Sequence, residues 1–158
     1  MPIPLIAAPS NLGLRPLYEG HVPGTWRAPQ ALLEAGLKEA LAPASVAELR
    51  RPPYSPQACA GTRLYNGHEM RRFNLALAEE VARARADGGF ALVVGGDCSV
   101  LLGCLAGVRR QGSVSLLHID GHSDFRHPGN YDPHATLGAV AGMDLALATG
   151  RGERLMTD

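Results

Sequence analysis

Apolar segments of strand length alternate with amphipathic segments of helix length along most of this 158-residue chain. The apolar runs that we expect to be strands lie at 3–8, 45–49, 90–94 and 113–119. The run at 90–94 is apolar on both faces, which is typical of a central strand in a parallel sheet, and 113–119 is expected to be another buried strand. This alternation predicts a three-layer α/β/α fold with a mainly parallel sheet.

Four amphipathic segments are predicted to be helices, and they lie at 29–41, 70–84, 101–108 and 137–148. The first begins at Pro29, and its buried stripe is expected to comprise Leu33, Leu37 and Leu41. The second ends at Gly88-Gly89, and its buried face is expected to comprise Met70, Phe73, Leu77, Val81 and Ala84. The polar segments at 11–27 and 51–67, rich in Pro or Gly, are predicted to be loops.

Residues whose side chains are able to bind a metal or take part in catalysis follow two of the predicted strands. Gly95-Gly96-Asp97-Cys98-Ser99 follows the run at 90–94, and Asp120-Gly121-His122-Ser123-Asp124 follows the run at 113–119. Side chains two apart in an extended segment share a face, so Asp120, His122 and Asp124 are expected to converge. Two carboxylates and an imidazole suit a divalent metal, and Cys98 can add a fourth ligand. Ligands of open α/β sheets bind at the carboxyl ends of strands, where both motifs lie.

Composition limits the other classes of function. The formal net charge is zero, which argues against binding to nucleic acid or to an anionic membrane surface. No apolar run is long enough to span a bilayer, and the N-terminus lacks a signal-peptide pattern. The three cysteines, an odd number without framework spacing, suit a reducing cytoplasm.

The two motifs resemble two metal motifs of the ureohydrolase family of arginases, agmatinases and formiminoglutamases, Gly-Gly-Asp-His-Ser and Asp-Ala-His-x-Asp. The segments at 8–13 and 24–29 also fit that family. The resemblance implies an arginase-like fold and a binuclear Mn²⁺ centre, with Cys98, Asp120 and Asp124 on the first metal and His122 and a bridging Asp120 on the second. It implies hydrolysis of a linear amidine or guanidino compound. Many members are trimers or hexamers, so a homo-oligomer is among the partners that the resemblance allows.

Three departures from the family pattern alter these expectations. Cys98 stands where the family has histidine, and a thiolate favours Zn²⁺ or Fe²⁺ over Mn²⁺. The family's proton-shuttle histidine aligns with Ala141, which leaves His134 and His127 as candidates and argues against L-arginine as the substrate. The third motif of the family, Ser-Phe-Asp-x-Asp, does not occur in the 158 residues. We therefore expect residues 1–158 to be a single truncated arginase-like domain that is inactive alone.

Two other functions stay open. In one, Cys98 is the nucleophile of a cysteine hydrolase and His122 its base, which leaves Asp120 and Asp124 unexplained. In the other, the domain is non-catalytic and serves an oligomeric or regulatory role. Structural roles are expected for Asp97, as an acceptor for backbone amides, and for His118, as a core histidine.

Overall fold

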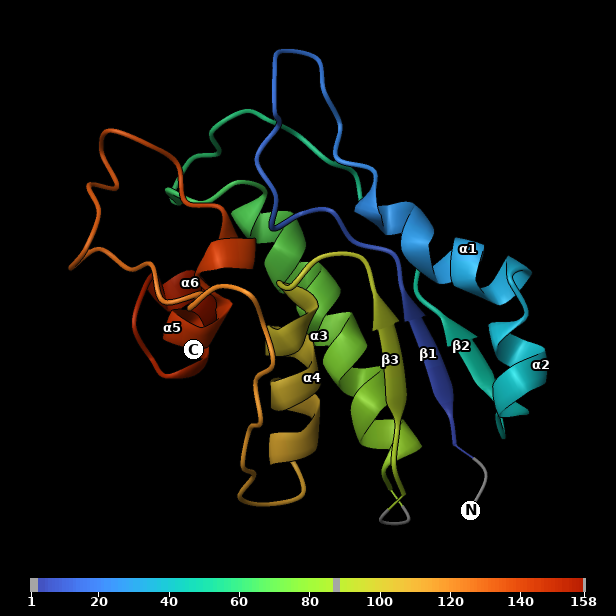
Figure 1. The fold of residues 1–158 in the computed structure, drawn as a ribbon. Coiled ribbons are helices and arrows are strands. Elements are labelled where there is room, and N and C mark those ends of the chain that lie inside the picture. The colour runs from blue at the N-terminus through green and yellow to red at the C-terminus, as the bar shows by residue number, and fades with distance from the viewer. Residues whose placement is uncertain (1–2, 87–88, 158) are drawn as a thin grey trace.

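Three parallel strands form the sheet of the computed structural model, which describes residues 3–86 and 89–157 (Figure 1). β1 (Leu5–Ala8) lies between β2 (Val46–Glu48) and β3 (Leu92–Gly95). All four residues of β1 are buried, so this short apolar segment is the centre of the sheet. The predicted α/β class with a parallel sheet is confirmed.

The helix predicted at 70–84 is confirmed as part of α3 (Gly67–Ala84). Its predicted apolar face is buried except for Ala84, which is partly buried, and it packs against the side of the sheet that carries Ile6 and Ala8. α4 (Val100–Arg109) lies beside α3. A Cβ at Gly107 would lie 2.7 Å from the Cβ of Val81, so glycine there permits the close approach of the two helices. The predicted end signal at Gly88 falls outside the described residues.

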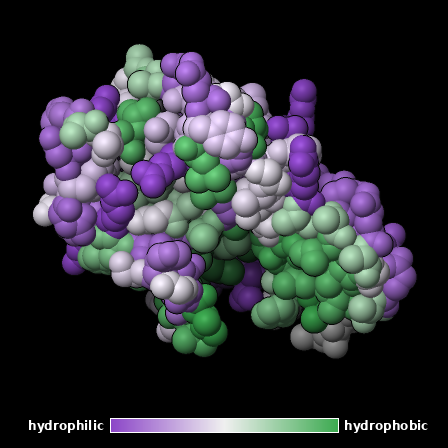
Figure 2. Space-filling model, turned by 45° about the horizontal axis from the view of Figure 1, so that its top comes forward, coloured by the Kyte–Doolittle hydropathy of each residue, from purple (hydrophilic) through white to green (hydrophobic). Residues whose placement is uncertain are grey.

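The prediction of one continuous helix over 29–41 is wrong. The structure has η1 (Thr25–Arg27), α1 (Ala28–Glu34) and α2 (Leu37–Leu41), with a break at Gly36, whose φ of 95° is left-handed. α1 contacts β1 and β3 and forms the third layer with α2. The predicted stripe is not buried, since Leu33 and Leu37 are half-buried and Leu41 is exposed. These two helices lie under the apolar surface at the right of Figure 2.

The prediction of a buried strand at 113–119 is also wrong. These residues form no strand, and their backbone forms no hydrogen bond to β3 within the described part of the chain. Ser113, Val114 and Leu116 instead line a groove with residues of α4 and of α5 (Asp144–Ala148). In Figure 1 this part of the chain is an extended trace beside α4. Leu117 and Ile119 are 84% and 87% exposed. β3, expected to be central, therefore lies at an edge of the described sheet.

The last predicted helix, at 137–148, begins later than expected. Gly138 forms an isolated parallel bridge with Leu64, which requires extended backbone there. The chain then forms η2 (Val140–Gly142), α5 (Asp144–Ala148) and α6 (Arg154–Thr157). None of the helices within the described residues combines the length and the apolarity that a bilayer crossing requires.

Candidate metal centre

The loop between β3 and α4 is held against the loop that follows β1. A Cβ at Gly96 would lie 1.8 Å from the Ser10 carbonyl oxygen, so only glycine allows this approach. The buried Asp97 carboxylate accepts hydrogen bonds from the Ser10 hydroxyl at 2.9 Å and from the Ser99 backbone N–H at 3.0 Å. Asp97 therefore has the structural role expected of it, and the loop presents the next residue, Cys98, at the surface.

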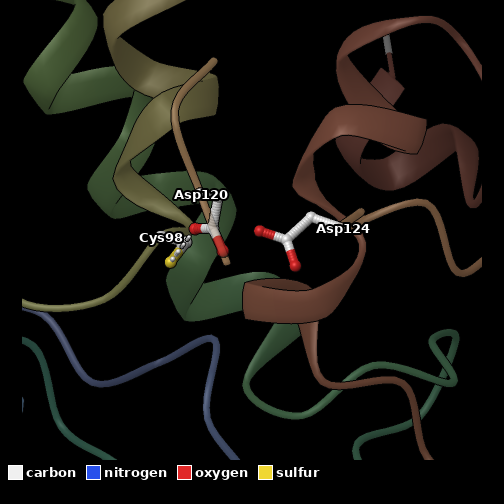
Figure 3. A group of neighbouring side chains, drawn as sticks. All are labelled: Cys98, Asp120 and Asp124. Atoms are coloured by element: carbon white, nitrogen blue, oxygen red, sulfur yellow. Dashed lines mark hydrogen bonds between the residues drawn. The ribbon is translucent and has the colours of Figure 1, made fainter. Parts of the chain in front are cut away.

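Three of the four predicted ligands come together at this loop. One donor atom from each of Cys98, Asp120 and Asp124 lies within 4.8 Å of the other two. The Cys98 thiol donates a long hydrogen bond to Asp120 Oδ2, at 3.9 Å, and the Asp124 carboxylate points toward both residues (Figure 3). Asp124 reaches this position from a left-handed backbone conformation, with φ of 45°. A thiol and two carboxylates are donors that bind divalent metals.

The fourth predicted ligand, His122, lies outside this group. Residues 120–124 are not in a strand, so the alternation of side chains that predicted convergence does not apply to them. The His122 ring is 87% exposed, and its Nδ1 lies 3.4 Å from Asp120 Oδ1. The same carboxylate oxygen accepts the His122 backbone N–H at 2.8 Å, and this bond is the main cause of the lowered pKa of Asp120.

The thiol stands among negative charges. Partial burial, followed by the charges of Asp144, Asp124, Asp120 and Asp97, raises the pKa of Cys98 to about 11. Without a cation the thiol is therefore protonated at neutral pH. A divalent cation beside these carboxylates reverses that preference, because metal binding displaces the thiol proton.

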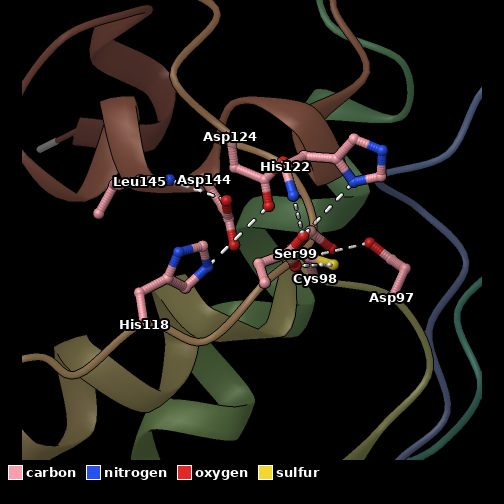
Figure 4. Close-up of polar contacts among 9 residues, drawn as sticks. Asp97, Cys98, Ser99, His118, His122, Asp124, Asp144 and Leu145 are labelled. Atoms are coloured by element: carbon pink, nitrogen blue, oxygen red, sulfur yellow. Dashed lines mark hydrogen bonds and ion pairs between the residues drawn. The ribbon is translucent and has the colours of Figure 1, made fainter.

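A second group of side chains whose types are able to bind metals lies next to the first, and it was not predicted from the sequence. His118, Asp124 and Asp144 also have donor atoms within 4.8 Å of one another (Figure 4). Asp144 is 1% exposed, and burial together with the charge of Asp124 raises its pKa to about 7. One signal was available in the sequence: Asp144 is the only charged residue in the apolar stretch 137–148.

The two candidate proton-shuttle histidines are in neither group. The His127 ring packs edge-on against Phe125, with the ring centroids 5.6 Å apart, and its Nδ1 accepts the Gly129 backbone N–H. His134 is exposed, and its backbone carbonyl accepts a hydrogen bond from Arg63. A role of either side chain in proton transfer stays a prediction.

One buried atom shows that the residues fit a cation. Asp124 Oδ2 is buried and has no hydrogen-bond partner among the described residues. A buried carboxylate oxygen without a partner is destabilising, and a cation would satisfy it. Asp124 belongs to both donor groups, so its two carboxylate oxygens are available to both.

Comparison with known proteins identifies the family of the chain. Residues 5–147 match the model of the Arginase family. The chain belongs to that family. It is 30% identical over 109 residues to an arginase of Entamoeba histolytica, a match that covers 66% of this chain and 36% of the relative. It is 33% identical over 91 residues to an arginase of Brevibacillus brevis, covering 57% of this chain and 29% of the relative.

Solved arginase structures share the fold. The crystal structure of Entamoeba histolytica arginase in complex with L-ornithine has a TM-score of 0.78 and 27% identity, covering 99% of this chain and 53% of that one. The Bacillus caldovelox arginase has a TM-score of 0.76 and 28% identity, covering 99% and 51%. This chain therefore spans about half the length of these arginase-family structures.

Proposed function

We propose that the chain is the metal-binding part of a hydrolase that cleaves a C–N bond in a linear amidine or guanidino compound. The observation that carries the proposal is the convergence of Cys98, Asp120 and Asp124 in a chain of the Arginase family. The relatives are named arginases, and one of them was crystallised with L-ornithine, which supports a small substrate of this kind.

In this proposal the three side chains hold one divalent cation. Bound there, such a cation supplies Lewis acidity that makes water a nucleophile near neutral pH. Asp120 contributes a carboxylate whose lowered pKa keeps it ionised, and the His122 backbone N–H orients it. Cys98 contributes a thiolate, which favours Zn²⁺ over the Mn²⁺ that the family resemblance implies. Binding of a cation by His122 stays a prediction from the sequence.

The same electrostatics oppose a cysteine hydrolase. A nucleophilic cysteine needs a lowered pKa and a base within hydrogen-bond distance. The pKa of Cys98 is raised to about 11, and its thiol donates to Asp120. The surrounding carboxylates favour a cation at the thiol and disfavour a free thiolate.

Cobalt binding tests the proposed ligands directly, because a thiolate ligand of Co²⁺ produces a charge-transfer absorption band. We expect the 158-residue chain to show this band. Cys98→Ser should abolish it, and Asp120→Asn should weaken cobalt binding at least tenfold. Cys59→Ser is the matched control, since Cys59 lies in the loop at 51–66 and its thiol is directed to the Gln57 carbonyl. A band that survives Cys98→Ser would show that Cys98 is not the thiolate ligand. No cobalt binding at all would favour the non-catalytic alternative.

The isolated chain is proposed to lack measurable amidine hydrolysis. It contains no Ser-Phe-Asp-x-Asp segment, and the exposed Leu117 and Ile119 favour association of the chain with itself. The assay is release of urea or ammonia from arginine, agmatine and guanidino acids with Mn²⁺ or Zn²⁺. Turnover that Asp120→Asn abolishes would support the hydrolase function and disprove the inactivity of the isolated chain.

A further inference from the structure

We propose that the groove between the loop after β2 and the first half of α3 binds a small phosphate monoester with an apolar body. The groove lies at the β2 edge of the sheet, whereas the metal-site loop follows β3 on the other side of β1 (Figure 1). Its volume of about 710 Å³ is within the range of small-molecule sites. This site is separate from the metal centre and does not depend on the proposed function.

Apolar surface forms one part of the groove. Leu49 and Pro52 contribute it from the loop, and Phe73 contributes it from α3. Phe73 and Pro52 are themselves buried, so this surface is fixed by the packing of the fold. A ligand with an apolar body would therefore remove hydrocarbon surface from water without a rearrangement of the core.

Positive charge forms the other part, in a chain whose formal net charge is zero. Three arginines line the groove: Arg50, Arg51 and Arg72. The acidic residue that lines it is Glu69, so three positive charges and one negative charge leave a net charge of +2. A phosphate monoester carries a charge of about −1.5 to −2 at pH 7 and matches this value, whereas a carboxylate carries only one negative charge.

Two of the three guanidinium groups are available to an anion. The Arg50 side chain is exposed and forms no hydrogen bond or ion pair with another described residue. Arg51 lies over the Trp26 ring, 3.6 Å from its centroid, and also has no acidic partner in the part of the chain that the structure describes. This contact orients the guanidinium without neutralising its charge. Guanidinium groups bind phosphate oxygens through paired N–H donors.

The third guanidinium is held back by the acidic residue. Arg72 donates hydrogen bonds to both carboxylate oxygens of Glu69, one turn earlier on α3. Both side chains are partly in solvent, where such a pair is weak. A phosphate in the groove is therefore able to compete with Glu69 for Arg72.

Trp26 supplies the readout, because it is the only tryptophan in the sequence and Arg51 lies over its ring. The probe is phenyl phosphate, titrated into the chelator-treated 158-residue chain so that no metal ion holds the phosphate. We expect a saturable change in Trp26 fluorescence that calorimetry reproduces. Phenyl phosphate should bind about tenfold more tightly than inorganic phosphate, which lacks the apolar body, or benzoate, which lacks the second charge.

Two variants should change phenyl phosphate binding in opposite directions. Arg50→Gln should weaken it about tenfold, because it removes an unpaired guanidinium. Glu69→Gln should strengthen it, because it removes the negative charge and releases Arg72. Arg71→Gln is the matched control: it removes the same charge from an exposed arginine on α3 that lines a different groove, with Leu75.

The outcomes decide the proposal. Weaker binding in Arg50→Gln, tighter binding in Glu69→Gln and little change in Arg71→Gln support it. Equal weakening in Arg50→Gln and Arg71→Gln would show that phosphate responds only to the net charge, and would overturn the site. The absence of saturable binding to the unmodified chain would overturn it as well. Inorganic phosphate or benzoate bound as tightly as phenyl phosphate would overturn the assignment to a phosphate monoester.

Discussion

Helix α3 and the segment 113–119 are both rich in apolar residues, yet they differ in what the fold does with them. Leu77 of α3 is fully buried between the sheet and α4, whereas Leu117 is 84% exposed. α3 finds the partners for its apolar face in β1 and α4. The segment 113–119 is not paired with β3. A hydrophobic pattern therefore shows which face a segment is able to bury, but burial also requires a partner surface.

The largest change in the free energy of unfolding is expected for truncation of Leu77, and Leu117 is its exposed counterpart. Leu77→Ala leaves a cavity in the core and should lower the free energy of unfolding by about 2–5 kcal/mol. Leu117→Ala removes an exposed side chain and should change it by no more than about 0.5 kcal/mol. Urea unfolding followed by circular dichroism measures both. Equal losses would show that 113–119 is buried in solution.

A smaller effect is expected from adding one methyl group at glycines of the two metal-site loops. Gly96→Ala should cost about 1–3 kcal/mol, because its Cβ would meet the Ser10 carbonyl oxygen and force the loops apart. Gly121→Ala is the matched control, since nothing lies within 4 Å of a Cβ there, and it should change the free energy of unfolding by less than about 0.5 kcal/mol. Thermal unfolding measures the stability of both variants. A larger loss of stability in Gly121→Ala than in Gly96→Ala would show that the 120–124 loop is packed against other residues.

The pH dependence of stability distinguishes the buried acid from exposed ones. The pKa of Asp144 rises from 3.8 to about 7 on folding, so the folded state holds its proton more tightly than the unfolded state. The resulting stabilisation is complete below about pH 4 and is lost as the pH rises through 7. In a chelator-treated sample, the Asp144→Asn variant should not show this fall in stability as the pH rises, which unfolding measured at several pH values would test.

Asp132→Asn is the control for that experiment, because Asp132 is exposed and its carboxylate accepts the His134 backbone N–H. Its unfolding midpoint should follow that of the unmodified chain between pH 4 and 7. Parallel pH profiles for all three proteins would show that Asp144 is ionised in the folded, metal-free chain.

The smallest effect should come from the ion pair between Glu79 of α3 and Arg110, which follows α4. Its two contacts are 2.6 and 2.7 Å, but both side chains are largely in solvent. Hydrogen bonding to Arg110 lowers the pKa of Glu79 below 4.5. The pair therefore stabilises the fold above that pH, and this contribution is lost as the pH falls further. A double-mutant cycle with alanine should show a coupling that salt reduces; a coupling as large as the Leu77→Ala effect would contradict it.

The same contrast explains how much of the fold the sequence could predict. Met70, Phe73 and Leu77 repeat at helical spacing over a long segment, and their partners lie in β1 and α4, so the helix was predictable. Gly36 lies within an equally regular leucine pattern, so the spacing did not indicate that its left-handed conformation would separate α1 from α2. The apolar run at 113–119 has the composition of a strand and lacks a paired neighbour in the described fold.

The candidate site was predictable in part for a similar reason. Cys98, Asp120 and Asp124 belong to motifs that follow apolar runs, and the structure brings them together. His122 was assigned by the period of a strand that does not form there. Asp144 is 20 residues beyond Asp124, and only the packing of α5 beside the 120–124 loop makes them neighbours.

The most direct test of the central claim is X-ray absorption spectroscopy of the chain loaded with one equivalent of Zn²⁺. Cys98, Asp120 and Asp124 as ligands predict one sulfur scatterer at about 2.3 Å, with the remaining oxygen or nitrogen ligands at about 2.0–2.2 Å. The sulfur shell should disappear in Cys98→Ser and persist in Cys59→Ser. A shell of oxygen and nitrogen alone in the unmodified chain would show that Cys98 is not a ligand and would contradict this account.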